Sequence, residues 1–134
     1  MLLKISNSPV FKGLNPEELE QLLGNVNHQI RNYSKEQIIA SRQEECKSLM
    51  ILIDGNVRGE MLDYSGKILK VEDIFAPRPI AAAFLFGQNN RFPVDVIANT
   101  DVEILKIPKE SMLKIFQENT RVLNNYLNSI SNRA

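Results

Sequence analysis

The sequence has few of the residues that build disulfides, metal sites and redox centres. Its 134 residues include one cysteine (Cys46), one histidine (His28) and no tryptophan. One cysteine excludes an internal disulfide and a cysteine-ligated metal or iron–sulfur cluster. One histidine leaves a metal site, or an axial haem ligand, without the partners it would need. We therefore expect no metal and no cofactor, and we expect His28 to lie on the surface or on a sheet face.

An excess of charge and long apolar runs are also missing. Lys and Arg number 16 and Asp and Glu number 16, so the formal net charge is zero. Such a chain has no overall field that would recruit nucleic acid, and we predict that it binds DNA poorly by itself. No apolar run approaches the length of a membrane span, and the start MLLKISNSPVF does not have the pattern of a signal peptide. We expect a cytoplasmic protein with no membrane partner.

Catalytic arrangements of side chains are not evident either. No histidine stands near a nucleophile, so a catalytic triad would lack its base. No glycine-rich phosphate loop of the Walker or dinucleotide-binding type occurs. Glu44 and Glu45 precede Cys46, and their charge would raise the pKa of the thiol, which opposes a reactive thiolate. We therefore predict that the chain is not an enzyme.

What the sequence does contain is a helix signal followed by many short strand signals. Asn15, Pro16 and Glu18 suit a helix N-cap, a first-turn proline and a capping-box acid, and they predict a helix over residues 16–23. Alternating or continuous apolar runs then predict strands near residues 26–31, 38–39, 49–53, 57–62, 68–74, 94–98 and 102–107. Asp54-Gly55 predicts a hairpin and Ser65-Gly66 the next turn. This spacing favours a sandwich or a barrel.

Residues 75–93 (FAPRPIAAAFLFGQNNRFP) interrupt the strand pattern. Pro77 and Pro79 are expected to break any ladder of strand hydrogen bonds. The small and aromatic residues at 81–86 are expected to form one helical turn, and residues 87–90 a loop. A loop of this kind between strands usually surrounds something small.

The end of the chain predicts two helices. The first opens at Pro108, and Asn119 or Thr120 can cap the second. Apolar residues of the second helix recur at steps of three and four, namely Val122, Leu123, Tyr126, Leu127 and Ile130. Such a seam either packs on its own domain or pairs with a second copy, and its length favours a homodimer. With no C-cap glycine before Ala134, the helix is expected to continue beyond that residue.

Six short segments carry a resemblance in their order and spacing: residues 9–14 (PVFKGL), 33–39 (YSKEQII), 52–57 (LIDGNV), 63–67 (DYSGK), 98–105 (ANTDVEIL) and 107–108 (IP). Together they resemble the sensory domain of the CRP/FNR family of bacterial transcription regulators, over essentially the whole chain. The resemblance implies a mainly β fold, a double-stranded β-helix (jelly-roll) barrel of the cyclic-nucleotide-binding type. Short flanking α-helices and the start of a C-terminal dimerisation helix, at about residues 120–134, would complete it.

The resemblance also implies which parts of the regulator sense the effector, form the dimer and bind DNA. Residues 1–134 would form one sensory domain, whose last helix dimerises. DNA would be bound only through a helix-turn-helix domain that this chain does not contain. An effector bound in the pocket would change the geometry of the dimerisation helices. The spacing of the two helix-turn-helix domains in the dimer would change with it.

The nucleotide-binding loop of the family can be compared residue by residue. Family members that bind cyclic nucleotides carry a Gly-Glu pair and then an Arg-Ser-Ala run, which hold the ribose and the cyclic phosphate. Aligned without gaps, the first falls on Ala81-Ala82 and the second on Phe92-Pro93-Val94. A buried phosphate without its counter-charge is costly. The sequence therefore predicts that ordinary cyclic AMP is not bound.

The same loop could instead surround an unidentified small-molecule effector. The candidate effector pocket comprises Ile80, Ala81, Ala82, Ala83, Phe84, Arg91, Phe92, Pro93 and Val94. Arg91 stands one position before the lost arginine, so it is either a shifted anion partner or a surface charge. Arg78, between two prolines, is a further rim charge to consider. The apolar members either line a pocket or fill the interior of the barrel.

Two alternatives remain at this stage. The chain could be a stand-alone interaction module of the same fold that has lost effector binding. A cupin-type β-barrel metalloenzyme is the other, although cupins hold their metal with clustered histidines and this sequence has only His28.

Overall fold

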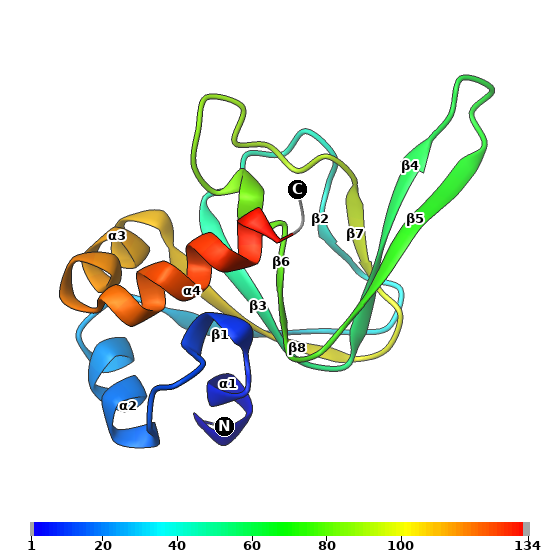
Figure 1. Ribbon diagram of the computed structural model, residues 1–134. Helices are drawn as coiled ribbons and strands as arrows, with labels where there is room; N and C mark the ends of the chain where they lie inside the picture. Colours follow the sequence, from blue (N-terminus) through cyan, green and yellow to red (C-terminus); the bar gives the residue numbers. More distant parts are fainter. Residues whose placement is uncertain (1, 133–134) are drawn as a thin grey trace.

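The structure, a computed structural model, describes residues 2–132 as two four-stranded antiparallel sheets beside a group of helices (Figure 1). The first sheet has the order β1-β8-β3-β6 and the second the order β2-β7-β4-β5. The strands are β1 (Gln29–Tyr33), β2 (Ile38–Ala40), β3 (Ser48–Asp54), β4 (Asn56–Leu62), β5 (Ile68–Phe75), β6 (Arg78–Ile80), β7 (Asp95–Ala98) and β8 (Val102–Pro108). The predicted jelly-roll class is confirmed, but the two sheets face each other without closing into a barrel.

The turn at Asp54-Gly55 is not the hairpin that the sequence predicts. β3 pairs with β6 and β8, whereas β4 pairs with β5 and β7, so the turn carries the chain from one sheet to the other. Gly55 has a φ of +85°, and a Cβ at this position would lie 2.5 Å from the carbonyl oxygen of Asp101. The glycine is therefore required by a close backbone approach at a corner between the sheets.

The prediction that the prolines break any strand is also wrong for Pro79. Residues of β6 pair with β3, with Pro79 opposite Ile51. β6 is the edge strand of its sheet, where a residue without an N–H can be accommodated. The expected turn at Ser65-Gly66 is confirmed, and the long β4–β5 hairpin that it closes extends away from the rest of the molecule (Figure 1).

The helices lie together on one side of the sheets (Figure 1). The predicted capping box is present: Glu18 N–H donates to Asn15 Oδ1 at 2.8 Å, and Asn15 N–H donates to Glu18 Oε1 at 3.1 Å. Asn119 caps the last helix by accepting from the N–H of Val122. The helices are α1 (Leu2–Ser6), α2 (Pro16–Gly24), α3 (Lys109–Glu118) and α4 (Thr120–Ser131), with 3₁₀ turns η1 (Pro9–Phe11) and η2 (Ala82–Phe84). Residues 133–134 of the predicted dimerisation helix lie outside the described residues.

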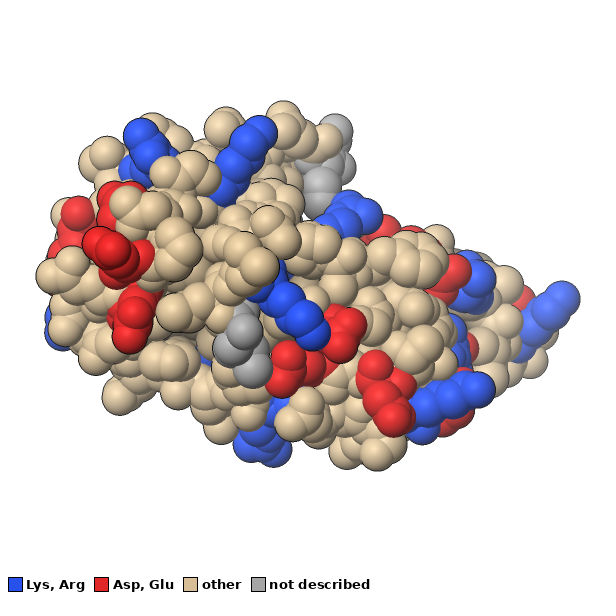
Figure 2. All heavy atoms as spheres, turned by 90° about the horizontal axis from the view of Figure 1, so that it is seen from below, with Lys and Arg blue, Asp and Glu red and all other residues tan. Residues whose placement is uncertain are grey.

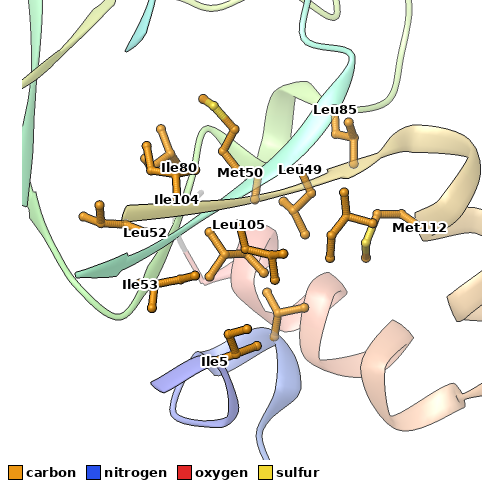
Figure 3. Close-up of a cluster of buried hydrophobic side chains, with 14 of the residues drawn as sticks. Ile5, Leu49, Met50, Leu52, Ile53, Ile80, Leu85, Ile104, Leu105 and Met112 are labelled. Carbon is orange, nitrogen blue, oxygen red and sulfur yellow. The ribbon is translucent and has the colours of Figure 1, made fainter. Parts of the chain in front are cut away.

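The core forms on both faces of β3, as its unbroken apolar run predicts. Every residue from 49 to 53 is buried. Figure 3 shows Met50 and Ile104 on one side of the sheet, and Ile5 of α1 and Met112 of α3 on the side of the helices. This two-sided packing fixes β6 and the loop after it, because β6 is hydrogen-bonded to β3.

Candidate functional site: an apolar pocket closed by α4

An apolar pocket lies where β6 and η2 approach the end of α4. Of the nine residues that the sequence suggests for an effector pocket, eight line it: Ile80, Ala81, Ala82, Ala83, Phe84, Phe92, Pro93 and Val94. The structure adds neighbours from four strands and from α4, namely Gly59, Glu72, Ile74, Pro79, Val96, Ser129 and Ile130. The irregular segment after β5 therefore does surround a hollow, and the last helix forms part of its wall.

The pocket is small and has little charge. Its volume is about 110 Å³. Sites for drug-sized ligands measure roughly 300–1,000 Å³, whereas an apolar cavity of about 150 Å³ holds benzene. Among residues 2–132, no Lys or Arg lines the pocket, and the one charged group in its wall is Glu72. Its size and lining therefore suit a small apolar group better than a cyclic nucleotide.

The backbone at the start of η2 has the conformation that a glycine would favour. Ala81 has a φ of 53° and a ψ of 37°, in the left-handed region, and directly precedes η2. In the gap-free comparison this is where nucleotide-binding relatives have the glycine of their Gly-Glu pair. Here an alanine adopts this conformation, and the next residue, Ala82, has a methyl group and no carboxylate.

Arg91 lies on the surface and does not line the pocket. Its backbone forms an isolated β-bridge with Glu45, and its Nη1 donates to the carbonyl oxygen of Gln43 at 2.9 Å. Of the two interpretations from the sequence, this placement corresponds to a surface charge. Arg78 is also exposed and lies in β6, outside the pocket wall.

A buried hydrogen bond connects α4 to the pocket. The hydroxyl of Tyr126 donates to the carbonyl oxygen of Ala82 at 2.6 Å. Its ring contacts Phe86 and Phe116, with ring centroids 5.9 and 5.2 Å away. Burial raises the pKa of Tyr126 to about 12, because the charged phenolate would lose its hydration. Helix α4 is thus anchored to η2 through one side chain.

The apolar seam of α4 is divided between two environments. Val122 and Tyr126 are buried in the domain's own core. Leu123 and Ile130 are partly buried against that core, and Leu127 leaves 45% of its surface exposed. Part of the seam therefore packs on its own domain, and Leu123, Leu127 and Ile130 remain as a narrower apolar stripe.

The lone cysteine and histidine lie in different environments. Cys46 is buried, and burial raises the pKa of its thiol, to which Glu44 adds a smaller contribution. His28 is exposed, with its Nδ1 3.1 Å from the carbonyl oxygen of Val26. Within residues 2–132, no group of three or more His, Cys, Asp or Glu side chains is placed to hold a metal ion.

Sequence reasoning missed the pocket residues that come from distant elements. Glu72 is on β5 and Gly59 on β4, while Ser129 is on α4. The sequence does contain a signal for Ser129. It follows Tyr126 by three residues, so the two side chains share one side of the helix. For Glu72 and Gly59 no local signal exists, since only the pairing of the strands brings them to the pocket.

Both signs of charge occur on the face seen in Figure 2. Acidic side chains gather at the left, basic ones lie along the upper edge, and the two signs lie close together at the centre and right, with broad areas of other residues between them. This agrees with the zero net charge. Among the described residues, no helix is long and apolar enough to cross a membrane.

Comparison with known protein families shows to which family the chain belongs. The family described as "Cyclic nucleotide-binding domain" matches residues 30–119, well over half of the sequence. The chain belongs to the cyclic nucleotide-binding domain family. The resemblance to CRP/FNR sensory domains that the sequence predicts is confirmed by this match together with the structures described next. No curated protein sequence matches the chain.

Three solved structures illustrate the similarity. A transcriptional regulator from Thermotoga maritima has 29% identity and a TM-score of 0.78, over 86% of this chain and 88% of that one. The sensor domain of the transcriptional regulator DNR from Pseudomonas aeruginosa has 21% identity and a TM-score of 0.79, over 98% and 86%. The Catabolite Activator Protein of Thermus thermophilus has 21% identity and a TM-score of 0.80, over 93% of this chain but 57% of that protein.

Proposed function

We propose that the chain is the effector-sensing and dimerisation domain of a CRP/FNR-type transcription regulator, and that it does not bind ordinary cyclic AMP. One observation carries the proposal: the apolar pocket at the family's binding loop has Ser129 and Ile130 of α4 in its wall. A ligand in the pocket would therefore contact the helix that is proposed to dimerise. Its differential affinity for two positions of α4 would shift their populations.

The effector in this proposal is a small, largely apolar molecule. The wall offers methyl groups and aromatic carbons, with Glu72 and Ser129 as its polar side chains. A cyclic phosphate would enter without a cation to neutralise it among the described residues that line the pocket. A molecule of roughly benzene's size fits the volume.

The proposed dimer forms through the apolar stripe of α4, in which Leu127 is exposed and Leu123 and Ile130 are partly buried. Leu123, Leu127 and Ile130 follow the steps of four and three residues that are typical of a helical contact. Tyr126, three residues after Leu123 and four before Ile130, lies beside this stripe and anchors the helix to η2. A shift of η2 would thus move the dimer contact through one connected helix.

The wider assignments rest on the family. We propose a non-enzymatic role, a cytoplasmic location, and DNA binding only through a further domain of the regulator. The similar structures are described as transcription regulators, which supports this role. No cluster of metal ligands within residues 2–132 favours the cupin-type alternative.

Titration of the protein with benzene, followed by the backbone amide signals in NMR, tests the sensing proposal. We expect shifts at residues 81–84, at Phe92 and Val94, and also at 129–131 if the pocket communicates with α4. Val94→Phe fills the pocket and should abolish these shifts. Val71→Phe is the matched control, since Val71 is exposed on β5 and does not line the pocket. Shifts that are absent, or that survive Val94→Phe, would contradict the proposal.

A further inference from the structure

A second hollow, here called the cationic groove, lies between η1, β6 and α4. Its side chains of interest are the cations Lys12, Arg78 and Arg121 and the amides Asn125, Asn128 and Asn132. Its volume is about 740 Å³, within the roughly 300–1,000 Å³ of typical small-molecule sites. The groove is thus large enough for a ligand that the apolar pocket cannot hold.

The charge of the groove is of one sign. No Asp or Glu is among the described residues that line it. None of its three cations forms an ion pair within residues 2–132. In a chain of zero net charge, three unneutralised cations in one hollow mark a place where a multiply charged anion is favoured.

The walls of the groove are held in position by hydrogen bonds. Asn125 Nδ2 donates to the carbonyl oxygens of Val10 and Lys12, at 3.0 and 2.9 Å. Arg121 Nη1 donates to the carbonyl oxygen of Gly13 at 2.6 Å. These contacts tie the segment that carries Lys12 to α4. An incoming anion therefore meets a frame that is already ordered, which reduces the entropy cost of binding.

Glycine at position 13 contributes to this frame. Its φ is +91°, and a Cβ there would lie 3.0 Å from Arg121 Cδ. The absence of a side chain lets the stem of Arg121 cross the backbone closely. The guanidinium has five N–H donors, so the bond to Gly13 leaves others for a ligand.

We propose that the cationic groove binds a phosphorylated small molecule of nucleotide size, with two or more phosphate groups on Lys12, Arg78 and Arg121. Arginine offers a planar fork that fits phosphate oxygens, and lysine adds a point charge. The amides of Asn128 on α4 and of Asn132, the C-cap residue four positions later, offer donors and acceptors to the uncharged part of such a ligand. Three cations are too few for the many backbone contacts of a protein that binds DNA by charge.

The groove is distinct from the apolar pocket but adjoins it. Pro79 of β6 and Ser129 of α4 line both hollows. A ligand that bridges β6 and α4 in the groove would stabilise the position of α4 against which the pocket closes. The anionic ligand and the apolar effector would then act on the same helix from separate sites.

Titration with inorganic pyrophosphate, followed by calorimetry and amide NMR, is the direct test. We expect a submillimolar dissociation constant at low salt, weaker binding as salt rises, and amide shifts at Gly13, Ser129 and Asn132. The double variant Lys12→Gln with Arg78→Gln should weaken binding at least roughly tenfold. Both side chains are exposed and neither bonds to a described residue through its charged group, so folding should be unaffected, as a melting curve will verify.

Two controls separate this site from others. Arg42→Gln removes an exposed cation outside the groove and should leave pyrophosphate binding unchanged. Val94→Phe fills the apolar pocket but removes no groove cation, so it should change pyrophosphate binding far less than the double variant does, and failure of the pocket proposal and failure of this one are distinguishable.

Further titrations identify the source of the phosphate groups. Tighter binding of ADP than of pyrophosphate would indicate a nucleotide, and equal binding would indicate recognition of the phosphates alone. Absence of pyrophosphate binding, or unchanged binding in the double variant, would overturn the proposal. Binding of a short DNA duplex at these residues without binding of pyrophosphate would overturn it in favour of a nucleic-acid contact.

Discussion

The hydroxyl of Tyr126 donates a 2.6 Å hydrogen bond to the carbonyl oxygen of Ala82, which joins the last helix to the turn that lines the pocket. Both residues are buried. A polar pair removed from water is costly to break, because the remaining partner stays unsatisfied. This pair is therefore a physical route by which the pocket and the proposed dimerisation helix can influence each other.

Tyr126→Phe should destabilise the domain. The substitution removes the donor and leaves the Ala82 carbonyl without it, at a cost of about 1–3 kcal/mol. Tyr33→Phe is a control, since the Tyr33 hydroxyl makes no hydrogen bond with a described residue, and it should change stability less. Thermal and denaturant unfolding measure the difference. Equal stability of the Tyr126→Phe variant and the parent would contradict an anchoring role.

The raised pKa of Tyr126 predicts a dependence of stability on alkaline pH. In the unfolded chain the phenol titrates near 10, and in the folded domain at about 12. Between these values the folded state holds a proton that the unfolded state has lost, so stability falls as pH rises through this window. The stability difference between the parent and Tyr126→Phe should therefore shrink from pH 10 to pH 12. A constant difference across this range would show that Tyr126 titrates normally.

Gly55→Ala should be strongly destabilising, in contrast to Gly24→Ala. At Gly55 the positive φ and the 2.5 Å approach to the Asp101 oxygen both oppose a Cβ, and we expect a loss of at least about 2 kcal/mol. At Gly24, the last residue of α2, a Cβ meets nothing within 4 Å, and alanine should stabilise by up to about 1 kcal/mol. Denaturant unfolding compares the two. A loss of stability well below this value for Gly55→Ala would mean that the turn between the two sheets can shift to accommodate a Cβ.

Leu127→Glu should weaken the proposed dimer and leave the fold of each copy intact. Leu127 is 45% exposed on α4, so its loss from a dimer contact would cost at least roughly tenfold in dimer affinity. Leu113→Glu is the matched control, because Leu113 is 47% exposed on α3, outside the stripe. Sedimentation over a range of concentrations measures the association. A parent protein that is monomeric throughout, or a dimer that both variants weaken equally, would argue against the stripe.

The sequence predicts features that depend on neighbouring residues better than features that depend on distant ones. The capping box of Asn15 and Glu18 and the hairpin at Ser65-Gly66 are local, and both are confirmed. The hairpin at Asp54-Gly55 was wrong because turn chemistry does not reveal which strands pair. Both edges of β3 are occupied, by β6 and β8, so the strand after Gly55 must join the other sheet.

The apolar pocket shows the same difference between features that depend on neighbouring residues and features that depend on distant ones. Its apolar loop residues stand close together in the sequence, and the structure gathers eight of the nine around one hollow. Arg91 could not be placed from the sequence, because a shift of one residue reverses the side to which a side chain points. Glu72 and Ser129 reach the pocket through strand pairing and helix packing, which depend on contacts far along the chain.

Calorimetric titration with cyclic AMP, and separately with cyclic GMP, tests the central claim most directly. The account predicts no saturable heat from either nucleotide in the micromolar range, because the apolar pocket is small and has no cation among its described lining residues. Micromolar binding of either nucleotide that Val94→Phe abolishes would place the nucleotide in this pocket. That result would contradict the account.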